Sequence, residues 1–368
     1  MGRAWIGGKP AALERALAAA AGLLAASRCP LIAGLGTDVA GARAAIGLAE
    51  RIGGVIDHMN SDALLRDLAV LREAGMMAIT PNEARLRADT LLLVGPSLEK
   101  EAPDLRRWLG LGSSGNGGGA TNRSLVRLCP GGGATIPGER IVACDVNQLL
   151  VVLAALRARL AGRPVGKSGI PAKAIEEVAT LLKAARFGVA VWSAVDLDAL
   201  AIEMLCGIVA DLNVATRFSG LAIPPGNNAT GVLQACGWMT GFPMRTGFGR
   251  GHPEHDPWRH DGARMIAAGE ADCVVWISAY RAAAPRWPNG PPLGPPVIAL
   301  TTGEATLGRG PAVQIEVGQP GVDHDGVEQC PMLGTLVAVA ATRRSETISV
   351  ADAIAAIMAA MPGTQVAA

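Results

Sequence analysis

The sequence predicts an α/β protein in which most of the sheet strands are parallel. Two observations carry this prediction. Short apolar runs such as residues 30–36 and 90–94 alternate along the chain with stretches of helical periodicity. Several of the apolar runs are uniformly apolar, as expected for strands covered on both faces by helices. With 368 residues, the chain is long enough for two lobes, each with its own core. We therefore expect two Rossmann-like lobes.

The first half of the chain reads as strand, loop and helix in repetition. Residues 29–36 form an apolar run that ends in glycines, and the following helical pattern places Ala42, Ala45, Ile46 and Ala49 on one face. Glycines at 53 and 54 end that helix. A short strand (54–59), a helix (62–75), a buried strand (88–97) and a helix (101–111) follow.

The remaining elements divide the chain as follows. Residues 1–27 are expected to form an N-terminal helix, and the Gly clusters between 112 and 138 are expected to form loops. Pro, Gly and Lys concentrate at 162–171, which predicts a boundary between a first lobe (28–163) and a second lobe (164–368). In the second lobe the apolar runs at 273–280 and 295–301 predict strands, and residues 348–361 a closing helix. The long stretch 219–262 predicts an irregular loop, and loops of that length are usually functional.

Composition excludes several classes of partner. The formal net charge is +1, so the chain has no strong positive electrostatic potential that would attract nucleic acid or an anionic membrane. No segment has the roughly 18 uncharged apolar residues of a membrane span. The seven cysteines are scattered without a C-x-x-C pair, so spaced zinc or iron–sulfur ligands are not expected. These features predict a cytoplasmic protein whose cysteines are mostly small buried side chains.

Two motifs are candidates for ligand binding. The sequence "GLGTDVAG" (34–41) follows a strand and opens a helix, but its last glycine is one residue too far for the dinucleotide pattern, and Asp57 and Asp62 read more simply as loop residues than as ribose ligands. The sequence "GHPEHDPWRHD" (251–261) carries His252, His255 and His260, yet its prolines prevent the helical pair that zinc motifs use.

Other polar residues give weaker signals. His58 and His324 are isolated in the sequence, and Ser193 has no evident base, so nucleophilic catalysis has no support. Tyr280 and Arg281 follow an apolar run at the position where an α/β sheet exposes its carboxyl-end crevice. Two interpretations of Tyr280 and Arg281 stay open: they bind a ligand in that crevice, or they are solvent-exposed residues at the end of a strand.

Taken in order, several segments together resemble a known family. These are "GLGTDVAGARAAIGLAERIGGVIDHMNSD", "ADTLLLVGPSLEKEAPDL", "GNNATGVLQACGWMTGFPMRTGFGRGHPEHDPWR", "AGEADCVVWISA" and "PGVDHDGVEQCPM". They resemble the B subunit of formylmethanofuran dehydrogenase, a member of the molybdopterin oxidoreductase group, from about residue 28 to about residue 335. The resemblance implies the molybdopterin oxidoreductase fold without its N-terminal iron–sulfur domain.

The departures from that family concern its redox centres. Redox members begin with a cysteine-rich segment for a [4Fe–4S] cluster, whereas the first cysteine here is Cys29, inside the first predicted strand. Those members also carry a metal-ligating cysteine just after the segment similar to "VIDHMNSDALL", and near Ala63 this chain offers only Asp62, Ala63, Leu64 and Leu65. Tungsten and molybdenum require a soft thiolate. The resemblance therefore implies a subunit that keeps the fold and has lost the redox chemistry.

This pattern is similar to the B subunits of bacterial formyltransferase/hydrolase complexes. The resemblance implies a non-catalytic structural subunit of a hetero-oligomer that converts formyl-tetrahydromethanopterin to formate through a methanofuran-like carrier. The implied partners are a formyltransferase subunit, a zinc-dependent amidohydrolase-like subunit and a further subunit. Zinc and the carrier are expected on those partners, and no catalytic residue, metal or cofactor is expected on this chain.

The segment within 219–262 resembles a loop that encloses the pterin in the family. We expect its residues to be vestigial here and to bind no cofactor. Four side chains in or near it, three guanidinium groups and one imidazole, are candidates for contact with a partner or with an anionic carrier. The vestigial positions are Asn227, Asn228, Thr240, Gly241, Arg250, Gly251 and His252, and the contact candidates are Arg245, Arg250, His255 and Arg259. Arg264 is a further arginine of this kind, and the alternative for all of these arginines is that they satisfy loop carbonyls and interface acids.

Two rival functions stay open at this point. One is an active formylmethanofuran dehydrogenase-type oxidoreductase that holds pterin and metal through other ligands. The other is a free-standing nucleotide-binding enzyme that uses "GLGTDVAG".

Overall fold

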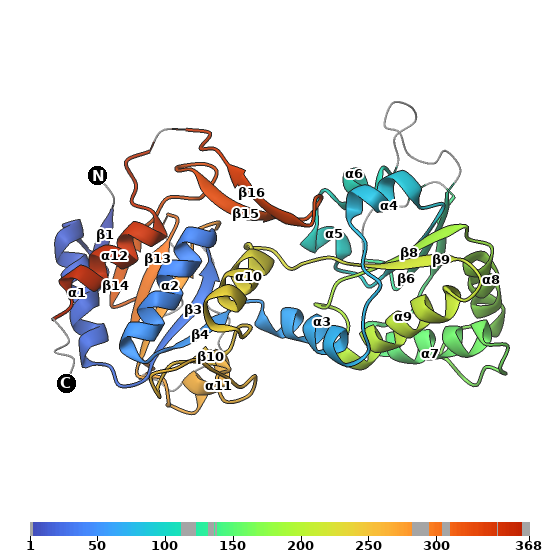
Figure 1. Ribbon diagram of the computed structural model, residues 1–368, viewed down its shortest axis with the longest axis horizontal. Helices are drawn as coiled ribbons and strands as arrows, with labels where there is room; N and C mark the ends of the chain where they lie inside the picture. Colours follow the sequence, from blue (N-terminus) through green and yellow to red (C-terminus); the bar gives the residue numbers. More distant parts are fainter. Residues whose placement is uncertain are drawn as a thin grey trace. The chain divides into compact units, whose positions relative to one another are not determined.

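The computed structural model describes residues 3–111, 123–131, 136, 138–281, 294–303, 310–343 and 345–362 (Figure 1). It has the α/β architecture with parallel sheets that the sequence predicts. The chain forms two compact units, and both are discontinuous. Unit 1 contains residues 1–61, 227–329 and 336–368, and unit 2 contains residues 62–226 and 330–335.

This division differs from the expected boundary at 163/164. In unit 2, β5 (Thr90–Val94) pairs in parallel with β8 (Phe187–Trp192), so one sheet includes strands from both sides of the Pro/Gly-rich stretch. In unit 1, β3 (Pro30–Gly36) pairs with β12 (Cys273–Ser278), which is more than 230 residues away in sequence. Strand pairing, which is not local in sequence, overrides the local linker signal.

Unit 1 is built on a nine-stranded sheet in the order β11-β10-β4-β3-β12-β13-β14-β1-β2. The five central strands are parallel, and antiparallel strands extend the sheet on both sides. The other strands are β1 (Ala4–Ile6), β2 (Lys9–Ala11), β4 (Val55–His58), β10 (Thr246–Gly247), β11 (Glu254–His255), β13 (Val297–Thr301) and β14 (Val313–Glu316). The helices are α1 (Leu13–Ala26), α2 (Val39–Ile52), α10 (Ala229–Thr240), α11 (Gly262–Ala267) and α12 (Val350–Ala360).

Helices cover both faces of the unit 1 sheet. Side chains of α1, α2, α10 and α12 share one apolar core with Ile32 and Leu35 of β3, and these helices lie together in Figure 1. On the other face Leu31 and Ala33 pack with α11. The predicted inner face of α2 is confirmed, because Ala42, Ala45, Ile46 and Ala49 are all buried.

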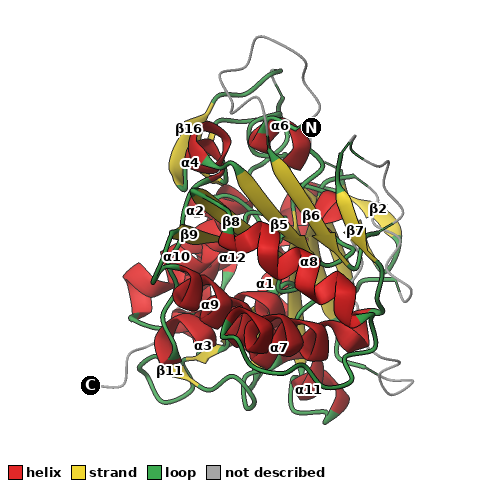
Figure 2. Ribbon diagram, turned by 90° about the vertical axis from the view of Figure 1, so that its right-hand side faces the viewer, coloured by secondary structure: helices red, strands yellow, loops and turns green. Residues whose placement is uncertain are grey.

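Unit 2 is built on a fully parallel sheet in the order β7-β6-β5-β8-β9. Helices α7, α8 and α9 cover one face (Figure 2), and α4, α5 and α6 the other. The remaining strands are β6 (Ser124–Leu128), β7 (Arg140–Val142) and β9 (Arg217–Ala222).

The helices of this part of the chain are α3 (Ser61–Glu73), α4 (Pro81–Arg87), α5 (Leu98–Glu101), α6 (Leu105–Leu109), the 3-10 turn η1 (Val146–Gln148), α7 (Leu149–Leu160), α8 (Ala172–Lys183) and α9 (Ala199–Leu212). A separate hairpin consists of β15 (Gly326–Cys330) and β16 (Thr335–Val339).

Three expected elements differ from the structure. The expected N-terminal helix 1–27 begins only at Leu13, because β1 pairs with β14 and β2 pairs with β1. The stretch 219–262 is not one loop, since it contains the end of β9, α10, β10 and β11. The expected helix at 101–111 is broken into α5 and α6. Most of the glycine-rich segment 112–138 lies outside the described residues.

Unit 2 contains a buried carboxyl group that should make stability depend on pH. Asp67 accepts a hydrogen bond from Trp192 Nε1 at 3.0 Å, and burial raises the pKa of Asp67 to about 6, against the opposing effects of Trp192 and Arg66. An unfolded Asp titrates near 4. The folded state therefore binds this proton more tightly, and the stabilisation that is full below about pH 4 is lost as the pH rises through about 6.

We expect Asp67→Asn to remove this dependence. An amide oxygen still accepts the indole N–H but carries no charge to bury. Between pH 4 and pH 8 the unfolding free energy of the variant should rise relative to the wild type by up to about 3 kcal/mol, the equivalent of two pKa units. Urea unfolding at several pH values measures this difference, and parallel pH profiles for the two proteins would contradict it.

No described helix is long and apolar enough to cross a membrane.

Candidate functional site

The candidate site is the segment 241–261 of unit 1, which is anchored on the edge of the sheet. Strand β10 pairs antiparallel with β4, and β11 pairs with β10. Arg245, directly before β10, adopts a left-handed backbone conformation with φ 62°, and its N–H donates to Ile56 O at 3.0 Å. The two short strands thus fix a segment that its glycines and prolines alone would leave irregular.

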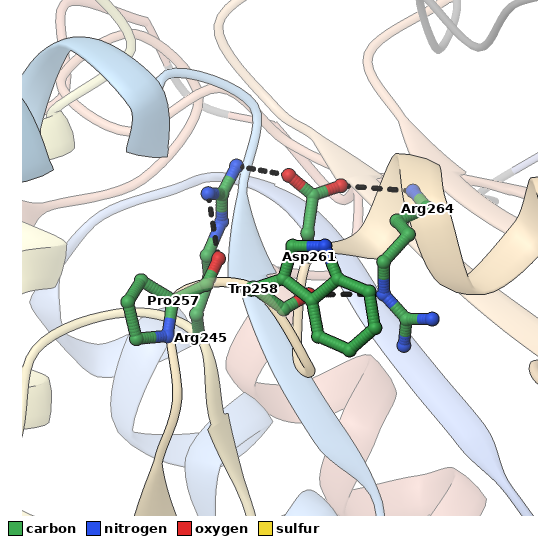
Figure 3. Close-up of a pocket in the computed structure, with 5 residues that line it drawn as sticks. All are labelled: Arg245, Pro257, Trp258, Asp261 and Arg264. Carbon is green, nitrogen blue, oxygen red and sulfur yellow. Dashed lines mark hydrogen bonds and ion pairs between the residues drawn. The ribbon is translucent and has the colours of Figure 1, made fainter.

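Arg245 is held at the centre of this segment by two carboxylates. Its Nη2 lies 2.6 Å from Asp261 Oδ2 and its Nη1 donates to Pro257 O at 2.9 Å (Figure 3). Its Nε lies 3.5 Å from Asp57 Oδ1. The Arg245 side chain is only 11% exposed. This expected partner or carrier contact is therefore a buried cation already engaged by acids of its own chain.

Asp57 comes from β4, in the core of the sheet, whereas the sequence predicts a plain loop residue. Its Oδ2 accepts the N–H of Gly262 at 2.9 Å, which ties β4 to the start of α11. Burial raises the pKa of Asp57 to about 6, while the Arg245 charge and the hydrogen bonds from Ser61 and Gly262 act in the opposite direction. The Arg245 charge thus favours the ionised form of Asp57.

Trp258 and Arg264 form the outer part of the same cluster. The Arg264 guanidinium carbon lies 4.5 Å from the centroid of the Trp258 ring, and Arg264 Nε donates to Trp258 O at 2.9 Å. Arg264 also pairs with Glu270 at 2.6 Å. Arg245, Pro257, Trp258, Asp261 and Arg264 line an open cavity of about 330 Å³ (Figure 3). Because each of these arginines has its own acid, the cavity offers no spare positive charge to an anion.

The three histidines of 251–261 do not converge on a common point for a metal. His255 Nδ1 and His260 Nδ1 lie 3.1 and 3.3 Å from the same backbone oxygen, that of Arg245. His255 also stacks on Phe242, with ring centroids 6.3 Å apart. Exposed His252 lies 3.9 Å from Glu254. Burial lowers the pKa of His260. Within the described ranges, no three His, Cys, Asp or Glu residues are arranged to hold a metal ion.

The positions that the resemblance marks as vestigial form hydrogen bonds within unit 1. Asn228 Nδ2 donates to Thr37 O at 2.9 Å, and its Oδ1 accepts from Gln329 N at 2.9 Å. His58 Nε2 lies 3.4 Å from Asn227 O, and burial lowers the pKa of His58 to about 4. Thr240 Oγ1 donates to Cys236 O at 2.8 Å.

The remaining vestigial positions fall on turns and on the exposed part of the segment. Gly241 ends α10 with φ 77°, and Gly251 has φ 79°. Arg250 pairs with Glu254 at 3.0 Å. The polar groups of this segment are thus largely used to hold its own shape.

The residues near Ala63, where the resemblance implies a lost metal ligand, include no soft donor for molybdenum or tungsten. Ala63, near the start of α3, is buried and packs in the apolar core of unit 2 with Val70. A methyl group offers no lone pair, and neighbouring Leu64 is equally apolar and buried. The thiolate that these soft metals require is therefore not provided at this position.

The residues of the "GLGTDVAG" motif have structural roles, in capping a helix and in strand packing. Asp38 caps α2, with its Oδ1 accepting the N–H of Gly41 at 2.9 Å. A phosphate at the first turn of α2, where dinucleotide folds bind it, would meet this carboxylate. Gly34 has φ 80°, and a Cβ there would lie 2.4 Å from Ile277 O, so its glycine is needed for strand packing. These features count against the nucleotide-binding alternative.

The weaker signals are structural as well. Ser193 is fully buried, and its Oγ accepts the N–H of Val195 at 3.3 Å. His324 Nδ1 lies 2.7 Å from Asp325 O. Tyr280 follows β12 as expected, and burial, with the nearby Glu328 and Asp38 carboxyls, raises the pKa of its phenol. Sequence reasoning missed Trp258, although a Trp in a polar loop of a chain with 3% aromatic residues is a usable signal.

Comparisons with known proteins agree with the resemblance. No protein-family model matches the chain. The chain is 35% identical over 334 residues to the B subunit of the formyltransferase/hydrolase complex Fhc of Methylorubrum extorquens, covering 88% of this chain and 87% of the relative. It is 27% identical over 282 residues to the B subunit of tungsten-containing formylmethanofuran dehydrogenase 2 of Methanocaldococcus jannaschii, covering 72% and 63%.

Among solved structures, the chain is similar to a chain of the formyltransferase/hydrolase complex FhcABCD from Methylorubrum extorquens in complex with methylofuran. The TM-score is 0.83 at 34% identity, and the match covers 96% of this chain and 97% of that chain. Identity and coverage at this level leave one assignment: the chain belongs to the family of formyltransferase/hydrolase complex B subunits, which is related to the B subunits of formylmethanofuran dehydrogenases.

Proposed function

We propose that this chain is a non-catalytic structural subunit of a formyltransferase/hydrolase complex. In that complex a formyl group would pass from formyl-tetrahydromethanopterin to a methanofuran-like carrier and be released as formate. The likeness over almost the whole chain to a subunit of FhcABCD in complex with methylofuran is the observation that carries the proposal. The partners would be a formyltransferase subunit, a zinc-dependent amidohydrolase-like subunit and a further subunit.

The chemistry of the chain's own residues supports a role without redox work. Formyl transfer and hydrolysis release no electrons, so they need neither an iron–sulfur cluster nor a soft metal. Ala63 lies near the position where the resemblance implies that a thiolate ligand would be required, and it belongs to an apolar core. The acids and arginines of the Arg245 cluster neutralise one another. These residues stabilise a surface rather than activate a substrate.

The test is a metal assignment for each subunit of the assembled complex. Native mass spectrometry of the purified complex, with release of single subunits in the gas phase, together with elemental analysis, measures which chain carries which metal. We expect zinc on a partner subunit and none of tungsten, molybdenum or iron on this chain. Stoichiometric tungsten, molybdenum or iron on this chain would overturn the proposal and favour the oxidoreductase alternative. Failure of the chain to join the three other subunits would also overturn it.

A further inference from the structure

The exposed apolar side chains of unit 1 are concentrated in one stretch of chain. Among the described residues of this unit, the large exposed hydrophobic side chains are Trp238, Met239, Phe242, Trp258 and Val327, and the first four fall within 21 residues. Trp238 and Trp258 are 65% and 70% exposed. Large exposed apolar side chains that gather in one segment are typical of interaction sites in soluble proteins. We call Trp238, Met239, Phe242, Trp258 and Arg259 the Trp258 surface.

The protein holds the most exposed of these residues in a fixed position. Trp258 N donates to Asp256 Oδ1 at 3.0 Å. Trp258 O accepts from Arg264 Nε (Figure 3), and the Arg264 guanidinium lies over the indole ring. Pro257, the preceding residue, is bound through its oxygen to buried Arg245. An indole held in this way loses little conformational freedom on binding, which is the property of an interface anchor.

Phe242 is supported by another residue of the same segment. Phe242 stacks on His255, and His255 Nδ1 lies 3.1 Å from the Arg245 oxygen. Trp238 and Met239 belong to the last turn of α10, a few residues before Phe242. The backbone of Arg245 therefore supports the His255 ring on which Phe242 stacks.

The charges of this segment indicate what kind of partner it fits. Arg245 pairs with Asp57 and Asp261, Arg250 with Glu254, and Arg264 with Glu270. Arg259 is exposed, and within this fully described segment its guanidinium is the one that forms no ion pair. A single spare cation beside four exposed apolar side chains suits a protein surface better than a carrier with an anionic tail, which would need several free cations.

We propose that the Trp258 surface docks another subunit of the same complex, which would present an apolar pocket for the indole and a carboxylate for Arg259. This inference rests on the proposed function, because it takes its occupant from the multi-subunit assembly. It assigns to Trp258 the role of anchor and to Arg259 that of the charged rim contact. Of the sequence-predicted contacts, it retains Arg259 and gives Arg245 and His255 supporting roles.

The test compares variants within the co-produced complex. The tagged chain is produced with the three other subunits, and its association with each is measured by native mass spectrometry and by titration. We expect Trp258→Ala to weaken association with one partner by about 30-fold or more, as for an aromatic hot spot. Arg259→Glu should weaken it too, by like-charge repulsion at the partner's carboxylate. The matched control is Leu200→Ala in α9 of unit 2, since Leu200 is 61% exposed and lies outside the surface.

The outcomes separate this inference from the proposed function. Assembly of the wild type, with both variants binding like the control, would overturn the docking inference and leave the proposed function intact. A wild-type chain that joins none of the three subunits would overturn the proposed function itself. Self-association of the chain through Trp258, abolished by Trp258→Ala, would also overturn the inference, because the occupant would then be a second copy. The unfolding temperature of Arg259→Glu should equal that of the wild type. In that case weaker binding by this variant cannot be attributed to unfolding of the chain.

Discussion

Replacing Gly34 with alanine should destabilise unit 1 by about 3 kcal/mol or more. Gly34 has φ 80°, in the left-handed region that disfavours any side chain, and an added Cβ would lie 2.4 Å from Ile277 O and 3.0 Å from Ile277 N. These atoms belong to the backbone of β12, so they cannot rotate away as a side chain could. The pairing of β3 with β12 at the centre of the sheet would have to shift.

The matched control for Gly34→Ala is Gly47→Ala in the helix that follows the same motif. Gly47 lies within α2, and a Cβ there would meet nothing within 4 Å. Because alanine is the better helix former, this control should gain about 0.5–1 kcal/mol. Chemical denaturation of both variants measures the contrast. Equal stability of the two proteins would show that the close approach of β3 and β12 is not as tight as described.

The Arg245→Met variant should lose about 3–5 kcal/mol of unfolding free energy, because it leaves buried acids without their counter-charge. Arg245 is 11% exposed and contacts both Asp57 and Asp261. The loss should be greater at pH 8 than at pH 5. Without the Arg245 charge the pKa of Asp57 rises above about 6, so the folded variant binds a proton at low pH and loses that stabilisation as the pH rises.

Two further variants make the Arg245 result specific. Arg250→Met removes an exposed cation paired with Glu254, and it should cost no more than about 1 kcal/mol because water screens the pair. Adding Asp57→Asn to Arg245→Met should recover part of the loss, since the amide carries no charge to bury. Urea unfolding at both pH values, with hydrogen exchange of β4 and β10, measures these effects. A pH-independent loss, or no recovery in the double variant, would contradict the role assigned to Asp57.

Much of the architecture could be predicted because it is local. The apolar runs at 30–36, 90–94 and 273–278 are strands, and the helix over 39–52 has the inner face that its periodicity predicts. The family could be identified from ordered motifs, and the comparisons confirm it. The lack of a cysteine at residues 62–65 can likewise be read from the sequence, because the presence or absence of a thiol does not depend on the fold.

Neither the division into units nor the burial and ion pairing of the site residues could be predicted from local sequence. Local composition indicated a boundary near 163, but unit 1 is completed by strands from residue 246 onward that add to a sheet begun by β3 and β4. The sequence also suggested Arg245 as a contact for a partner or carrier. The structure places Asp57, almost 190 residues earlier, within 3.5 Å of its Nε.

The sequence by itself determined the α/β class, most of the elements, the family and the absence of a soft ligand at residue 63, because periodicity, turn residues and side-chain chemistry are properties of short segments. Only the tertiary structure decided which strands share a sheet, which arginines are neutralised, and that Trp258 and Arg259 stay exposed beside a buried ion-pair cluster. Strand pairing and ion pairing join residues far apart in the chain, and their energies depend on burial, which exists only once the sheet has formed.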